Sequence, residues 1–263
     1  MTKLQIILVV ASLALLGILY FAFDIRPPKH AEVTAERAKA AQVPDINPIL
    51  KNARAKLTPE IANELAFLEK GAEQAGADTA KIAFLKQLSG RWYQLKEPAI
   101  SGYYAEILAE QINTEAAWSI AGTTFSICVQ RAKDEKTSDY CSQHSVKAFE
   151  NAISLNPENV SHRINLALSY TEKPPQDNPM KGILMLVDLN KKYPDSVPVL
   201  MQLGRLAIQT GQYKKAVERL SKAVSLRPDE IRAHCLLAKA YQGDGQTEQA
   251  SRHEKICLSE QVE

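Results

Sequence analysis

Four cysteines carry the most distinctive side-chain chemistry in this 263-residue chain. They are Cys128, Cys141, Cys235 and Cys257, an even number that disulfide bonds could consume in pairs. Because disulfides persist mainly outside the cytoplasm, the oxidation state of these thiols also bears on the compartment. A zinc site made of Cys128, Cys141 and His144 is the alternative. The sequence offers it neither a suitable fourth ligand nearby nor a paired C-x2-C spacing.

No familiar catalytic motif is present in the sequence. It contains no G-x-S-x-G, H-E-x-x-H, Walker loop or C-x-x-C-H pattern. The histidines have no partner at catalytic or metal spacing, and we expect most of them on solvated helix surfaces: His30, His144, His162, His234 and His253. We therefore predict a protein that is not an enzyme, with no catalytic residues, no bound metal and no cofactor.

The composition favours helices packed through small residues. Apolar residues make up 45% of the chain and aromatic residues only 6%, which suits helix packing better than a sheet sandwich. Lysine and arginine number 32 against 30 aspartates and glutamates, so no broad positive field attracts polyanions. Nucleic acid is therefore not an expected partner, and no small-molecule substrate is indicated.

One stretch, from Val197 to Glu230, predicts a complete helical hairpin. Its first half carries an apolar stripe at helical spacing, which ends at Gly211 where the chain must reverse: Leu200, Leu203, Gly204 and Ala207. Its second half carries another stripe, which stops at Pro228: Ala216, Leu220 and Ala223. The small residues in both stripes would let two antiparallel helices approach closely.

This spacing resembles the tetratricopeptide repeat (TPR), a 34-residue unit with the pattern W-x2-L-G-x2-Y, then A-x3-F, then P. An earlier unit matches the same pattern through Trp118, Ala121, Gly122, Phe125, Phe149, Ala152 and Pro157. The phase continues from about Glu115 to the end of the chain. The resemblance implies an all-α fold, a TPR-type α-solenoid of antiparallel helix pairs, with units at about 115–159, 160–196, 197–230 and 231–263.

The register of this resemblance places the cysteines. The first unit carries about eleven residues more than the 34-residue repeat. Cys128 would end its first helix and Cys141 begin its second, so both would stand at the base of a looped-out segment, VQRAKDEKTSDY. A disulfide there would contribute roughly 3 kcal/mol through loop closure; two free thiols in a reducing compartment are the alternative. Cys235 and Cys257 fall on the two helices of the last unit, where a bridge and free thiols are both open.

In the TPR family, residues of the first helix of each pair line the concave side of the solenoid. Position by position, this geometry gives the candidates for a peptide-binding groove: Ser119, Thr123, Ser126, Ile164, Leu168, Met201, Arg205, Ile208, Arg232 and Lys239. A partly apolar groove that contains a methionine and three cations would favour an amphipathic or unfolded segment with some acidic character. The alternative is that several of these residues pack against the amino-terminal helices.

The amino terminus, residues 1–23, predicts a membrane anchor. Leu4 to Phe23 is 20 residues without a formal charge. As one transmembrane helix it would span the roughly 30 Å hydrocarbon core of a bilayer. A cleaved signal peptide is the alternative, although its apolar region is normally shorter and ends in an A-x-A-like site. Orientation is contested: basic residues after the span favour a cytoplasmic domain by the positive-inside rule, whereas the cysteines favour an exported one.

Two further segments lie between the anchor and the repeats. Residues 24–57 are rich in proline, alanine and charge, so we expect a juxtamembrane linker with short helical pieces, TAERAKAAQ first among them. Residues 58–114 predict amino-terminal helical hairpins, either a degenerate repeat or a cap. Thr58 is the expected N-cap of the first helix in this segment, and the last is expected from about Pro98 to Ile112.

Together these features predict a single-pass membrane protein of a bacterial inner membrane, with its TPR domain in the periplasm. The chain resembles membrane-anchored periplasmic TPR proteins, and among them uncharacterised envelope proteins of Bacteroidota. That resemblance implies a non-enzymatic adaptor, chaperone-like or assembly factor that binds a peptide or helix of other envelope proteins. The alternative is a permanent structural subunit that braces a multi-subunit membrane complex.

Overall fold

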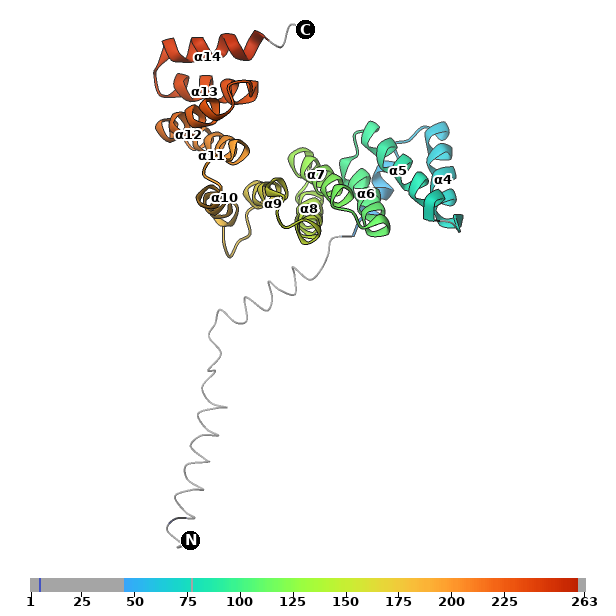
Figure 1. The fold of residues 1–263 in the computed structure, drawn as a ribbon. Coiled ribbons are helices and arrows are strands. Elements are labelled where there is room, and N and C mark those ends of the chain that lie inside the picture. The colour runs from blue at the N-terminus through green and yellow to red at the C-terminus, as the bar shows by residue number, and fades with distance from the viewer. Residues whose placement is uncertain (1–4, 6–44, 77, 260–263) are drawn as a thin grey trace. The chain divides into compact units, whose positions relative to one another are not determined.

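The computed structural model describes Gln5, residues 45–76 and residues 78–259. The chain divides into two units, Met1–Val43 and Pro44–Glu263, and helices α3 to α14 all belong to the second. Within the described residues the fold is all-α, with twelve such helices and no strand (Figure 1).

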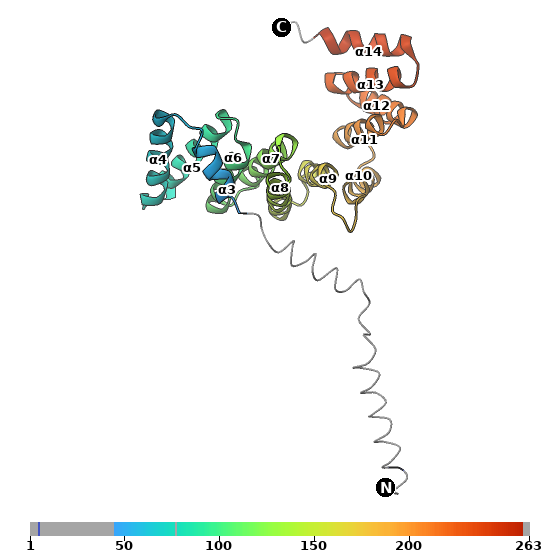
Figure 2. The same cartoon turned by 180° about the vertical axis from the view of Figure 1, so that it is seen from behind.

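Four helices precede the region of clearest repeats: α3 (Asn47–Arg54), α4 (Pro59–Gln74), α5 (Asp78–Gln94) and α6 (Pro98–Ile112). The remaining eight are α7 (Glu115–Arg131), α8 (Glu135–Leu155), α9 (Val160–Glu172), α10 (Lys181–Lys192), α11 (Val197–Gln209), α12 (Tyr213–Leu226), α13 (Ile231–Gly243) and α14 (Thr247–Ser259). Each odd-numbered helix from α5 to α13 packs on the helix that follows it, and Figure 2 shows these pairs from behind.

Local chemistry explains where many of these helices begin and end. The Thr58 hydroxyl accepts a hydrogen bond from the Ile61 amide, as expected for the N-cap of α4. Thr114 caps α7 and Asp134 caps α8 in the same way. Gly211 has a φ of 71°, a left-handed conformation that lets the chain reverse between α11 and α12 at little steric cost.

Small residues lie where paired helices cross, as the repeat pattern predicts. A Cβ added to Gly122 would come within 2.8 Å of the Phe149 ring, and one added to Gly204 within 2.5 Å of the Leu220 side chain. Ala216 is fully buried. These close approaches confirm that the helices of α7/α8 and α11/α12 nest through small side chains, since a larger residue at either glycine would force them apart.

The amino-terminal hairpins share one core with the first repeat. This core contains side chains of α3 to α6 together with side chains from the C-terminal half of α7, such as Phe125, and from the N-terminal half of α8, such as Tyr140. Helix α3 contributes Ile46 from its N-cap position together with Leu50 and Ala53, and it packs against α6. Residues 47–54 of the expected linker therefore form a helix that belongs to the compact unit.

The extra residues of the first repeat do not form the loop that its register predicted. Helix α7 is 17 residues long and α8 is 21 residues long, with only Ala132 to Asp134 between them. The segment VQRAKDEKTSDY thus extends both helices beyond the usual repeat length. The physical reason is that Asp134 starts α8 early, by accepting hydrogen bonds from the Thr137 amide and hydroxyl.

None of the helices in the described residues is both long and apolar enough to cross a bilayer. The anchor expected at Leu4–Phe23 lies outside the described residues, except for Gln5. The expected helical piece TAERAKAAQ lies outside them as well.

Candidate functional site

The groove candidates divide into three groups by exposure. Thr123, Arg232 and Lys239 are exposed on α7 and α13. A second group is half-buried on the first helices of the repeats: Ser119, Ser126, Leu168, Arg205 and Ile208. Ile164 and Met201 are buried, with 5% and 8% of their surfaces exposed. Neither side chain is therefore accessible to a bound peptide, contrary to the prediction from the sequence.

Neighbouring repeats account for the burial of Ile164 and Met201. In two places the first helix of one repeat contacts the first helix of the next: α7 contacts α9, and α11 contacts α13. Met201 on α11 belongs to a core cluster that includes Ala233 and Leu237 of α13. Ile164 on α9 belongs to another, with Leu186 of α10 and Val199 of α11. Both side chains therefore serve the packing between repeats.

Ser126 is drawn into a buried hydroxyl network behind the groove. Its Oγ lies 2.9 Å from Ser145 Oγ, which in turn lies 2.9 Å from Ser169 Oγ. Ser145 also donates to the Gly122 carbonyl at 3.1 Å. This network links α7, α8 and α9, so the Ser126 hydroxyl is already engaged and serves the interior more than the groove surface.

An acidic residue that sequence reasoning did not single out lies beside the groove candidates. Glu172, the last residue of α9, accepts a hydrogen bond at Oε1 from Gln130 Nε2 of α7 at 2.6 Å. Its other oxygen, Oε2, is buried and has no hydrogen-bond partner among the residues that the structure describes. Burial raises the pKa of Glu172, against smaller opposing effects of Gln130 and the positive charge of Arg205.

Buried ion pairs fasten the hairpins to one another. Glu106 of α6 lies 2.5 Å from His144 Nδ1 and 2.7 Å from Lys147 Nζ, both on α8. Burial acts to raise the pKa of Glu106, but the hydrogen bonds from His144 and Lys147 hold it below its usual value. The pair ties the amino-terminal hairpins to the first repeat.

A second polar cluster joins the first repeat to the next. Glu115 Oε1 lies 2.6 Å from His162 Nε2, and Glu115 also accepts hydrogen bonds from Asn156 and Asn159. These hydrogen bonds lower the pKa of Glu115 to about 2. Most of the histidines were expected on solvated helix surfaces, and that expectation is wrong for the four that the structure describes, because none of them is exposed. His144 and His162 are each held by a carboxylate from another helix.

Both candidate cysteine pairs are bridged, the predicted one and the one that the sequence left open. Cys128 bonds to Cys141 across the ends of α7 and α8, with Cα atoms 5.9 Å apart. Cys235 bonds to Cys257 across α13 and α14, with Cα atoms 5.0 Å apart. The zinc site considered as an alternative is not formed, because Cys128 and Cys141 are joined in a disulfide and His144 contacts Glu106. No group of three or more metal-ligating side chains occurs in the part of the chain that the structure describes.

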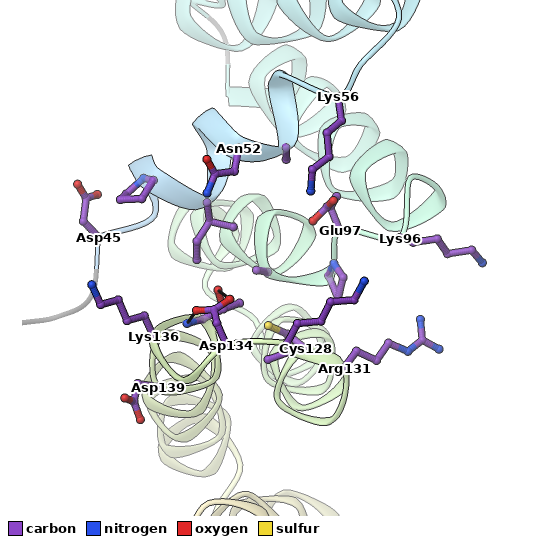
Figure 3. Close-up of a pocket in the computed structure, with 18 residues that line it drawn as sticks. Asp45, Asn52, Lys56, Lys96, Glu97, Cys128, Arg131, Asp134, Lys136 and Asp139 are labelled. Carbon is purple, nitrogen blue, oxygen red and sulfur yellow. Dashed lines mark hydrogen bonds between the residues drawn. The ribbon is translucent and has the colours of Figure 1, made fainter.

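A cleft of about 680 Å³ opens next to the first disulfide (Figure 3). Its walls come from α3, the turn between α5 and α6, the start of α6, the end of α7, the turn after it, and the start of α8. Cys128 lines it, as do apolar residues of these segments: Pro48, Ile49, Ala53, Pro98, Ala99 and Ala132. No groove candidate lines this cleft, so it is a separate surface made by the turn ends of the hairpins.

The helices form antiparallel pairs, and the same sequence pattern recurs at the same place in successive pairs. The groove candidates lie along the first helix of each pair. This arrangement defines an α-solenoid, a class of fold that acts in protein interaction. Its repeats resemble tetratricopeptide repeats, and the family model for the TPR repeat matches residues 204–245. No match was found among curated proteins.

Several solved structures are similar to this chain at low sequence identity. TTC0263, a thermophilic TPR protein of Thermus thermophilus, is 15% identical, with a TM-score of 0.50 over 67% of this chain and 90% of its own. PilW, a type IV pilus biogenesis factor, is 15% identical, with a TM-score of 0.47 over 68% of this chain and 76% of its own. MamA of Desulfovibrio magneticus RS-1 is 18% identical, with a TM-score of 0.45 over 70% and 97%.

Proposed function

We propose that this protein is a non-enzymatic scaffold, anchored in a bacterial inner membrane by residues 1–23, that binds a peptide segment of other envelope proteins through its TPR domain. The observation that carries the proposal is the TPR repeat architecture, with polar and cationic side chains left accessible on its first helices. TPR domains generally act by binding other proteins, and solenoids offer extended surfaces for that purpose.

The side chains that remain accessible favour a particular kind of guest. Leu168 and Ile208 are half-buried and apolar, while Arg205, Arg232 and Lys239 supply positive charge. An amphipathic segment with some acidic residues fits this mixture, because apolar contacts would give affinity and the cations would select charge. The burial of Ile164 and Met201 makes the groove more polar than the sequence alone suggested.

Export to the periplasm is the second part of the proposal. The two disulfides support it, because structural disulfides are rare in reducing compartments. The apolar run Leu4–Phe23 supports membrane attachment at the same end. The basic residues that follow this run argue in the opposite direction by the positive-inside rule, so orientation needs its own measurement.

Site-specific photo-crosslinking in cells tests the binding surface. A photoreactive residue at Thr123 or Lys239 is expected to capture envelope proteins, whereas one at Lys214, exposed on α12, serves as the matched control. Equal capture from all three positions would contradict the proposal that the first helices form the binding groove. Native mass measurement of the extracted protein then separates varied substoichiometric clients from one fixed stoichiometric complex, and the latter would favour a permanent structural subunit.

Thiol labelling in spheroplasts tests the location. With both disulfides formed and the domain outside, a membrane-impermeant maleimide should label the protein only after a reductant is added. Free thiols that react only after lysis would place the domain in the cytoplasm and contradict the proposal. A variant with all four cysteines replaced by serine is the control for labelling of other groups.

A further inference from the structure

The cleft beside Cys128 has one rim on which positive charge is left uncompensated. Five cations line the cleft. Lys56 lies beside Glu97 and Lys136 lies on the side of Asp45 and Asp139 (Figure 3). The other three form this rim: Lys96 in the turn between α5 and α6, Arg131 at the end of α7, and Lys133 in the following turn. All three are exposed, and among the described residues none of them has an ion-pair partner within 4.0 Å. We call these three residues the cationic rim.

The acidic residues of the cleft do not neutralise this rim. Asp134 accepts hydrogen bonds from Thr137, and Asp139 forms an ion pair with Lys173. Asp45 accepts hydrogen bonds from Asn47. Figure 3 shows Asp45, Asp134 and Asp139 on the side of the cleft away from Lys96 and Arg131, with Glu97 directed toward Lys56.

Helix α6 adds to the positive potential of the same rim. It begins at Pro98, and its N-cap residue Glu97 makes no side-chain capping hydrogen bond. Pro98 and Ala99 line the cleft, so the positive end of the helix dipole faces it. A carboxylate at this rim would therefore meet positive potential from the exposed cations and from the start of α6, with Glu97 as the one acidic side chain at that helix start.

We infer that this cleft binds an acidic peptide segment of a partner protein, with its carboxylates at the cationic rim and its apolar side chains against the aliphatic walls. The Asn52 side chain is exposed at the wall of the cleft and has no hydrogen-bond partner in the described residues, so its amide is free for the peptide backbone. The disulfide between Cys128 and Cys141 holds the wall that carries Arg131 and Lys133. This site is independent of the groove proposed above.

Other occupants fit the cleft less well. None of its lining residues is aromatic, so it offers no platform for stacked bases of a nucleic acid. The chain's own linker is also a poor match. Between Asp24 and Val43 it carries Arg26, Lys29, Arg37 and Lys39 against three acids, and this basic balance would be repelled by the rim.

Fluorescence anisotropy with the full-length protein in non-ionic detergent tests the inference. The probe is a short dye-labelled peptide in which glutamate and leucine alternate with glycine, compared with an identical peptide carrying glutamine for glutamate. We expect the glutamate peptide to bind more tightly, and its affinity to fall as salt is raised, because exposed charge pairs are screened. Equal binding of the two peptides would overturn the inference.

Three matched variants locate the binding. The triple substitution Lys96→Gln, Arg131→Gln and Lys133→Gln is expected to weaken the glutamate peptide by about tenfold or more, as lost charge contacts at an interface usually do. The control triple removes the same charge at exposed positions on α5, α12 and α14: Lys86→Gln, Lys214→Gln and Lys255→Gln. It should change affinity by less than about twofold, because these sites are remote from the cleft.

A groove triple, Arg205→Gln, Arg232→Gln and Lys239→Gln, distinguishes the two proposals. If it abolishes peptide binding while the cleft triple has no effect, the cleft inference is wrong and the groove is supported. An equal loss in the control triple would show a general charge effect and would also overturn the cleft. A single-stranded oligonucleotide that binds the cleft more tightly than the peptide would assign it to nucleic acid instead.

Discussion

The carboxylate of Glu172 is held at the end of α9 with only one of its two oxygens hydrogen-bonded. Because burial raises its pKa in the folded protein, the unfolded chain gives up this proton more readily. Stability from this group is therefore present below the ordinary glutamate pKa of 4.5 and falls as pH rises through the folded value. Glu172→Gln should remove that loss, and denaturant unfolding at pH 4 and pH 8 would measure it.

A surface glutamate provides the matched control for this prediction. Glu248, on α14, is exposed, and its one ion pair within the described part of the chain is a contact of 3.7 Å to Arg252. Glu248→Gln should leave the difference in unfolding free energy between the two pH values unchanged. If Glu172→Gln behaves in the same way, then burial of the Glu172 carboxylate carries no cost and our account of this residue is wrong.

A pair of histidines makes the last repeat sensitive to acid. His234 Nδ1 lies 2.9 Å from His253 Nδ1, and His234 Nε2 lies 3.0 Å from the Pro228 carbonyl, to which it must donate. Burial, the charge of His234 and that of Arg252 lower the pKa of His253. The unfolded chain therefore takes up this proton first.

The stability from His253 should be present above its ordinary pKa of 6.5 and lost as pH falls below that value. Chemical unfolding of the wild type and of His253→Gln at several pH values between 5 and 8 would measure the effect. Glutamine keeps a polar side chain at this position but does not titrate. We therefore expect a shallower dependence on pH for the variant, and parallel curves would contradict the prediction.

These residue-level features were the least accessible to sequence reasoning. The carboxylate partners of His144 and His162 and the ring partner of His234 lie 38, 47 and 19 residues away in the sequence, on helices brought close by folding. The burial of Ile164 and Met201 has the same origin. A repeat pattern identifies which face of a helix a residue occupies. It does not tell whether the neighbouring repeat covers that face.

At the scale of the helical element, the crossing of α9 and α10 depends on Gly182. A Cβ added to Gly182 would lie 2.3 Å from the Ala167 carbonyl oxygen, which belongs to the backbone of α9 and cannot rotate away. The two helices would have to separate. We expect Gly182→Ala to lower the free energy of unfolding by about 1–3 kcal/mol, as overpacked cores usually do. Thermal and denaturant unfolding would measure the loss.

The same substitution at Gly90 is the matched control. Gly90 lies within α5, and a Cβ added there would meet nothing within 4 Å. Alanine costs less conformational entropy than glycine in a helix, so Gly90→Ala should stabilise the protein by about 0.5–1 kcal/mol. A lower unfolding free energy for Gly182→Ala and a higher one for Gly90→Ala would support the close crossing of α9 and α10. A loss of stability in both variants would contradict the prediction, because Gly90 has no neighbour for an added Cβ to meet.

The ends of a helix could be predicted from the sequence where a capping or helix-breaking residue marks them. They were predicted less well where the argument assumed a fixed repeat length. The N-cap at Thr58, the start of α6 at Pro98 and the reversal at Gly211 all follow from short sequence signals. The loop expected between α7 and α8 was wrong because it rested on a fixed 34-residue unit. The segment VQRAKDEKTSDY contains no proline or glycine to interrupt a helix, and Asp134 with Thr137 signals a new start.

For the whole molecule, the sequence predicted the class of fold but placed the start of the folded region too late. Repeat phase is a strong signal because each hairpin must bury the same face against the next. Helix α3 is only eight residues long and lies outside that phase, so nothing periodic announces it. Its attachment depends on contacts with distant residues. Arg54 forms an ion pair with Glu69 at 2.8 Å, and Glu69 also accepts a hydrogen bond from Tyr104 at 2.6 Å.

Two soluble fragments test whether α3 is part of the folded unit. A fragment that begins at Pro44 retains Ile46, Leu50 and Ala53 in the amino-terminal core, whereas one that begins at Thr58 leaves their sites on α4 to α6 open to water. After allowing for the entropy of ordering α3, we expect the longer fragment to be more stable by about 2–4 kcal/mol. Denaturant unfolding would measure this, and Leu50→Ala in the longer fragment should reproduce part of the loss. Equal stability of the two fragments would return residues 47–54 to the linker, because burial that contributes nothing to stability cannot define a folded unit.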